Sequence, residues 1–385
     1  MPSDEDPIDP VFDPTGATRF DVRERLGEAP EGGDAAVDAL AFSRDGRRLY
    51  VAVGGALLEA GLATGRWRRT RRWLGQYDED VAPGTVRVRD VLEVPRAGAL
   101  AVHAIGDPPP GTMRTEFAVW LARSRDHATA LRCTPDPERL PDLQALAVAP
   151  GAPRAAAIEF VGFGGGDPGA ETRLVMLDGR TGQELEWFPP EGACAVALSP
   201  DGTRVALAGG DALTLFEPAT GARRRVALST RSRRTRMRFS PDGGRLFVAT
   251  PSPAPSLLRS GRDFARAPAR LAVVDAHAAA VAHVTELAGD GLYPVAVTPR
   301  GTCVFARMEA RDAAFWGEDE LAPARGEVRL TRVRPGAAAT PARTWDVAPA
   351  RAPATALAVS PGLRHVAWAA AGDVHVAPLT PARAR

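Results

Sequence analysis

The sequence predicts an all-β protein built from repeated four-stranded antiparallel units, which is the arrangement of a β-propeller. A short apolar strand followed by a tight turn recurs along the chain, as in ALSPDG and RFSPDGG. Strand-like alternation is frequent, and helical periodicity is scarce. The chain has 385 residues, of which 45% are hydrophobic. These observations favour one large repeat fold with a substantial core.

Each unit begins with an apolar strand and a turn of the Ser-Pro-Asp-Gly type. The first strands read DALAFS, QALAVA, CAVALS, PVAVT and TALAVS. In the turn, the serine hydroxyl can bond the backbone ahead of it, proline fixes φ, and glycine accepts the positive φ that closes the turn. Ser199 lies in such a turn and could be a nucleophile. Because the motif recurs at Ser43 and Ser240, we interpret Ser199 as a structural residue.

Three further strands complete each unit. The second follows the turn, as in RRLYVAV, the third follows a connection of variable length, as in ALTLFE, and the fourth is more polar, as in ELEWF. The first-turn positions are Ser43, Val94, Ala149, Ser199, Ser240, Thr298 and Ser360. They predict seven blades, which cover approximately residues 37–76, 86–133, 143–190, 193–228, 235–289, 292–348 and 354–380.

The last unit ends before a fourth strand, so it needs an outer strand from elsewhere. The stretch TRFDVRERL precedes the first unit, and we expect residues 18–28 to supply this strand and close the propeller. A single seven-bladed domain would then span residues 18–380. Residues 1–17 are acidic and proline-rich and are predicted to be disordered.

The strand-turn-strand stretches AFSRDGRRLYVAV, ALSPDGTRVALAG and RFSPDGGRLFVAT resemble the signature of bacterial WD-repeat-like seven-bladed β-propellers. The resemblance covers nearly the whole chain, although only four or five units show it clearly. No unit has the Gly-His dipeptide of the eukaryotic form, and the one Trp-Asp pair, Trp345 and Asp346, lies on a predicted outer strand. The buried Asp-His-Ser/Thr-Trp network of that form is therefore not expected.

Composition excludes several functions. All 48 basic residues are arginine, which excludes P-loop and Schiff-base lysine chemistry and favours a GC-rich, bacterial coding sequence. The net charge of +1 and the position of the arginine clusters 66–73 and 222–238 on predicted outer strands argue against a nucleic-acid partner. The N-terminus is unlike a signal peptide, and no apolar run reaches about 18 residues. We expect a cytoplasmic monomer with no membrane contact.

The usual catalytic and metal-binding motifs are missing. Cys133, Cys194 and Cys303 have no CxxC spacing, the six histidines are scattered, and no HExxH or GxSxG motif occurs. The sequence therefore predicts no metal, no cofactor and no catalytic residue.

Four blades have long connections between their second and third strands, at 106–115, 162–171, 251–269 and 308–326. In a propeller these connections emerge on one face, so they favour a binding surface. The connection in the sixth blade contains an aromatic pair among acidic residues, which is typical of an interface anchor. The predicted partner-binding residues are Phe315, Trp316, Asp312, Glu318, Asp319 and Glu320. The alternative is that the aromatic rings fold back onto the blade.

A second candidate site is the mouth of the central channel. The residues entering the innermost strands are mostly polar, which either hydration or a ligand pocket would explain; they are Asp38, Arg89, Gln144, Cys194, Thr235, Tyr293 and Thr355. Asp90, Arg236 and Arg238 also interrupt the apolar pattern, and the simplest interpretation is ion pairing across blades.

These observations predict a non-enzymatic scaffold that binds a protein or peptide on the face with the long connections. The alternative is a propeller enzyme of the lactonase or cyclotransferase kind, with its site at the channel mouth. Such an enzyme would need several acids or a histidine there, and Asp38 is the only acid among the channel-mouth residues.

Overall fold

The structure is a computed structural model. It describes residues 10–12, 18–21, 37–53, 56–64, 66–71, 86–95, 99–106, 115–122, 141–161, 171–190, 192–209, 212–228, 230, 235–250, 269–287, 292–297, 303–308, 328–333, 345–347, 354–362, 364–370 and 373–381.

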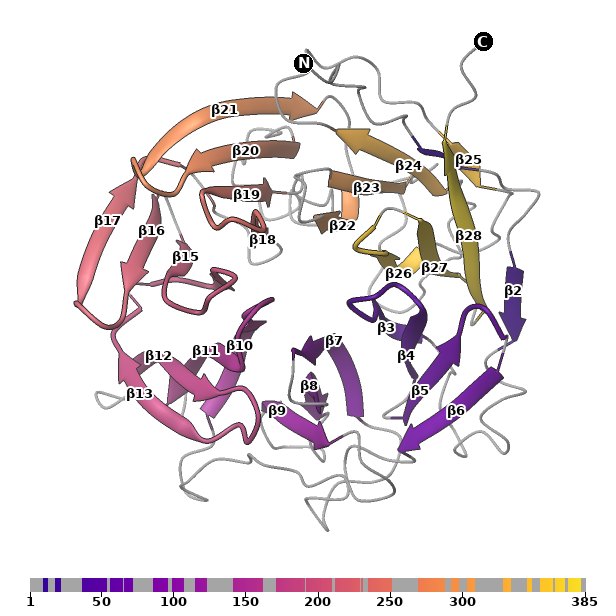
Figure 1. Ribbon diagram of the computed structural model, residues 1–385, viewed down its shortest axis with the longest axis horizontal. Helices are drawn as coiled ribbons and strands as arrows, with labels where there is room; N and C mark the ends of the chain where they lie inside the picture. The colour runs from indigo at the N-terminus through magenta and orange to yellow at the C-terminus, as the bar shows by residue number, and fades with distance from the viewer. Residues whose placement is uncertain are drawn as a thin grey trace, which may run out of the picture.

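The described residues form antiparallel sheets arranged in a ring, which is the arrangement of a β-propeller (Figure 1). Within this part of the chain every regular element is a strand, and no helix occurs. In a typical sheet the strands follow chain order from the centre of the ring outward (Figure 1). The prediction of an all-β propeller is therefore confirmed.

Five sheets have four strands. The first contains β3 (Val37–Phe42), β4 (Arg48–Val53), β5 (Ala56–Gly61) and β6 (Arg66–Arg71). The second contains β10 (Pro141–Val148), β11 (Arg154–Val161), β12 (Glu171–Asp178) and β13 (Glu184–Phe188), and the third contains β14 (Ala195–Leu198), β15 (Val205–Gly209), β16 (Ala212–Glu217) and β17 (Ala222–Val226). The fourth contains β18 (Arg236–Phe239), β19 (Arg245–Thr250), β20 (Ala269–Asp275) and β21 (Ala280–Leu287). The fifth contains β22 (Leu292–Val297), β23 (Cys303–Met308), β24 (Val328–Val333) and β25 (Trp345–Val347).

The two remaining sheets depart from the predicted seven four-stranded blades. One has three strands in the described residues, β7 (Val86–Val94), β8 (Ala99–Gly106) and β9 (Thr115–Ala122). The other has five, β26 (Ala354–Val359), β27 (His365–Ala370), β28 (Asp373–Pro381), β1 (Pro10–Phe12) and β2 (Thr18–Asp21). The described residues therefore show five four-stranded blades, not the predicted seven. The fifth strand of the last sheet arises because β28 is long enough to pair with two separate N-terminal segments.

The N-terminal segment pairs with the last strand of the chain. Thr18–Asp21 lies antiparallel to residues 373–376 of β28, and β27 pairs with the same residues of β28, so β2 occupies the opposite edge of that strand. The predicted closing segment 18–28 thus pairs with the last sheet over its first four residues. β1 falls within residues 1–17, which were predicted to be disordered, and pairs with residues 379–381. Both strands satisfy backbone groups along an edge that would otherwise be open.

The core lies between neighbouring sheets. Because each sheet packs on both of its faces, the second strands are buried nearly throughout, as in β4, where every residue after Arg48 is buried. The sheet of β3–β6 packs through Leu49 and Val51 on the sheet of β26–β28, and through Tyr50 on the sheet of β7–β9. Burial of these side chains is the main stabilising term of the fold.

The Ser-Pro-Asp-Gly turn forms as the sequence predicts. Ser199 is fully buried; its N–H donates to the Arg204 carbonyl at 2.9 Å, and its carbonyl accepts from Gly202 N–H at 2.9 Å. The Ser199 hydroxyl donates to Asp201 Oδ1 at 2.5 Å and accepts from Arg204 N–H at 2.9 Å. Gly202 has a φ of 73°, the left-handed conformation that favours glycine. Ser43 and Ser240 make the same contacts, which supports the structural interpretation of Ser199.

We expect Ser199→Ala to lower the free energy of unfolding by about 1 kcal/mol, because the Arg204 N–H loses its acceptor and Asp201 loses a donor. Burial alone would raise the pKa of Asp201, but the hydrogen bonds from Ser199 and Thr203 outweigh it and lower that pKa. Urea denaturation measures the loss. A loss of partner binding by the folded variant would contradict the structural assignment.

Candidate functional site

The ring has two ends, which are formed by different connections between strands. The turn end is formed by the turns between the first and second strands of each sheet, such as the turn at Ser199. The insertion end is formed where the second strand connects to the third. Because neighbouring strands are antiparallel, these connections lie at opposite ends of each sheet.

Connections at the insertion end differ in length. β4, β15 and β27 reach the next strand across residues 54–55, 210–211 and 371–372. The connections after β8, β11, β19 and β23 span residues 107–114, 162–170, 251–268 and 309–327. The predicted partner-binding residues belong to the last of these and lie outside the described residues; they are Phe315, Trp316, Asp312, Glu318, Asp319 and Glu320.

The predicted channel-mouth residues coincide with β-bulges in the innermost strands, at the insertion end. In β3, Val37 pairs with Val53 and Ala39 with Ala52, so Asp38 is the extra residue. A β-bulge re-aims side chains and is frequent at the rims of closed sheets. The same irregularity occurs at Arg89, at Gln144, at Thr355 and between Leu292 and Val295, where Tyr293 lies.

The two remaining innermost strands are shorter. Cys194 precedes β14, and its N–H donates to the Ala208 carbonyl at 2.8 Å although Ala195 is the register partner of Ala208. Thr235 directly precedes β18. The predicted channel-mouth residues therefore lie at a β-bulge in five of the innermost strands and just before the other two, and the bulge itself was not predicted.

These positions have different surroundings. Asp38 Oδ2 accepts a hydrogen bond from Val88 N–H of the neighbouring sheet at 3.4 Å. Gln144 is partly buried. The hydroxyl of Thr235 is buried without a hydrogen-bond partner. The side chains of Arg89, Tyr293 and Thr355 lie outside the described part of the structure.

An ion pair joins opposite sides of the ring. Arg236 Nη2 on β18 lies 3.5 Å from Asp90 Oδ2 on β7. The sheets β10–β13 and β14–β17 lie between these two strands along the ring, and β7 faces β18 across its centre (Figure 1). The pair therefore spans the centre of the ring and does not join adjacent blades. The side chains are 46% and 35% exposed, so water reaches both groups.

Arg238 lies two residues beyond Arg236 on the same strand and therefore on the same face of β18. Desolvation by burial lowers the pKa of its guanidinium. Within the described part of the chain, its guanidinium donates no hydrogen bond and forms no ion pair. The centre of the ring thus holds the Arg236–Asp90 pair, and Arg238 follows on the same face of β18, unpaired among the described side chains.

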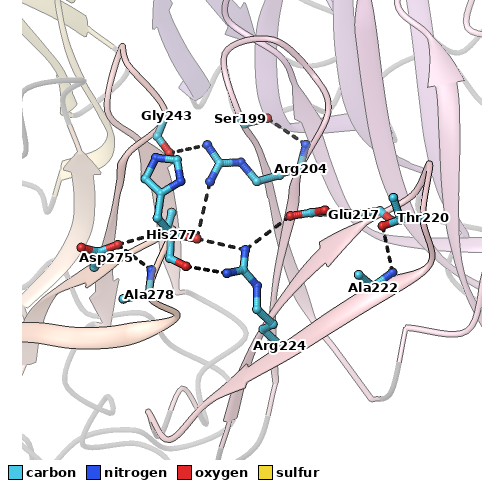
Figure 2. Close-up of polar contacts among 11 residues, drawn as sticks. Ser199, Arg204, Glu217, Thr220, Ala222, Arg224, Gly243, Asp275, His277 and Ala278 are labelled. Atoms are coloured by element: carbon cyan, nitrogen blue, oxygen red, sulfur yellow. Dashed lines mark hydrogen bonds and ion pairs between the residues drawn. The ribbon is translucent and has the colours of Figure 1, made fainter.

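The turn end is occupied by contacts between neighbouring sheets. Arg204, after the Ser199 turn, donates through Nη2 to the Gly243 carbonyl at 2.8 Å and through Nη1 to the Ala276 carbonyl at 3.5 Å. Arg224 on β17 donates to the carbonyls of Ala276, at 3.3 Å, and His277. Figure 2 shows both guanidinium groups reaching the turns of the next sheet.

A further contact joins Gly151 N–H, in the turn after β10, to the carbonyl of Pro200 in the Ser199 turn at 2.7 Å. Several polar groups of the turn end therefore join neighbouring sheets.

Within the described ranges, no group of three or more histidine, cysteine, aspartate or glutamate side chains could hold a metal ion. The same ranges contain no helix with the length and apolar character to cross a membrane. No protein-family model matches the chain, and no curated protein matches it in sequence.

Proposed function

We propose that the protein is a non-enzymatic scaffold that binds a protein or peptide at the insertion end of the ring. One observation is the main support: the long connections of four sheets leave the ring at the end where the innermost strands bear polar residues on bulges. The opposite end is occupied by contacts between sheets. A surface with variable connections on a rigid ring suits recognition of another chain.

The proposal includes a closed ring of seven blades, similar to the bacterial WD-repeat-like propellers. In this arrangement β7–β9 is the second blade, and β2 is the outer strand of the seventh. The pairing of β2 with β28 supports closure, because it joins the two ends of the chain within one sheet.

The proposed anchor is Phe315 and Trp316, with Asp312, Glu318, Asp319 and Glu320 around them. Its support is positional: β23 ends at Met308 and β24 begins at Val328, so the segment that contains the anchor is attached at the insertion end. Buried aromatic anchors commonly supply most of the energy of an interface.

Selection of peptides from a random phage-displayed library on the purified full-length protein tests the proposal. We expect families of binding peptides whose affinity falls by about tenfold or more in the double variant Phe315→Ser, Trp316→Ser. The matched control is Arg47→Gln, an exposed side chain at the turn end, which should leave affinity unchanged.

Each outcome has a distinct meaning. Equal affinity of the double variant and the wild type would reject the aromatic anchor. Peptides that respond to Arg47→Gln instead would reject the insertion end as the binding face, and failure to select any peptide would reject the scaffold function.

A further inference from the structure

We infer that the bound peptide presents a carboxylate group to the centre of the ring, where Arg236 and Arg238 receive it. This inference rests on the proposed function and specifies the chemistry of its partner. It starts from the unusual pairing of charges on β18 and β7.

A cation without a partner favours an anionic ligand. Arg238 is partly buried, and a guanidinium that is partly removed from water gains more from an anionic acceptor than one at the surface does. Arg238 has no partner among the described residues, although burial lowers its pKa. An anion that arrives with the ligand would supply the missing acceptor.

A buried polar group at the start of the same strand also lacks a partner. Thr235, immediately before β18, is 2% exposed, and its hydroxyl has no hydrogen-bond partner. A buried hydroxyl without a partner is also unfavourable. The strand that bears Arg236 and Arg238 therefore begins next to a polar group that the described residues do not satisfy.

The charges of these residues favour a carboxylate over a phosphate. Arg236 already binds a carboxylate, that of Asp90, at 3.5 Å. The two arginines and Asp90 sum to one positive charge, which a single carboxylate neutralises and a doubly charged phosphate would exceed. Alternate Cα atoms of a strand lie about 6.5 Å apart, so two long arginine side chains on one face can converge on one carboxylate.

Asp90 also acts as an internal competitor in this arrangement. Its carboxylate holds Arg236 when no ligand is present, and an incoming carboxylate can bind Arg238 and share or replace Asp90 at Arg236. Removing the charge of Asp90 should therefore strengthen binding, whereas removing that of Arg238 should weaken it. Opposite effects at two positions are not expected from a purely structural role.

The test uses fluorescein-labelled peptides from the phage selection, each made with glutamate, glutamine or phosphoserine at one acidic position. We expect the glutamate form to bind the wild type about tenfold tighter than the glutamine form. Arg238→Gln should abolish this preference, and Asp90→Asn should increase it. Arg225→Gln, an exposed arginine on β17, is the matched control and should preserve it.

Melting temperature checks the fold of each variant. Arg238→Gln should not lower it, because the substitution removes an unpaired charge from a partly buried position. A preference for glutamate that survives in Arg238→Gln would overturn the inference. Tighter binding of the phosphoserine form would overturn the carboxylate assignment.

If the selected peptides bind without needing an acidic residue at any position, the inference is rejected and the scaffold function stands. Failure of the selection to yield any peptide would reject both.

Discussion

Gly209→Ala is expected to lower the free energy of unfolding by about 3 kcal/mol or more, because the added methyl group has no space. A Cβ atom at this position would lie 2.3 Å from the Gly192 carbonyl oxygen and 2.7 Å from Ala193 Cα. Both are backbone atoms of the segment that enters β14. That segment cannot move away easily, because the N–H of Cys194 donates to the Ala208 carbonyl at 2.8 Å.

Urea denaturation of the purified protein measures this effect. The matched control is Gly244→Ala, whose Cβ would meet nothing closer than an Asp242 side-chain atom at 3.5 Å. We expect the control to change the free energy of unfolding by no more than about 0.5 kcal/mol. Equal losses in the two variants would show that the close approach at Gly209 does not restrict the backbone.

The sequence predicted those features that depend on neighbouring residues. Turn chemistry is local: the hydroxyl of Ser199 bonds Arg204 five residues ahead, and Gly202 supplies the positive φ. The alternation of apolar residues likewise predicted the innermost and second strands, because burial on both faces leaves little freedom in their composition.

Features that depend on distant segments were not predicted. Arg236 and Asp90 each appeared as polar interruptions of an apolar strand, but their pairing depends on the width of the ring. The bulge at Asp38 depends on the register between β3 and β4, which the polar character of one residue does not specify. The structure shows five four-stranded blades, and residues 123–140, on which the outer strand of the predicted second blade would fall, lie outside its described part.

At the turn end, we expect Arg204 and Arg224 to be coupled in their contributions to the free energy of unfolding. Arg204 and Arg224 both donate to the carbonyl of Ala276, a fully buried residue in the turn after β20. When one arginine is replaced, the Ala276 carbonyl still accepts from the other. When both are replaced, it loses both donors. Because an unsatisfied buried acceptor costs more than a weakened hydrogen bond, the two losses should not be additive.

We therefore expect the double variant Arg204→Met, Arg224→Met to lower the free energy of unfolding by about 3 kcal/mol. This loss should exceed the sum of the losses in the two single variants by about 1 kcal/mol. Arg204→Met should be the more damaging single change, because Arg224 is 40% exposed and water can replace part of its contacts. A double-mutant cycle by urea denaturation measures the coupling, with the exposed Arg225→Met as control. Additivity within about 0.3 kcal/mol would show that the shared carbonyl does not couple the two arginines.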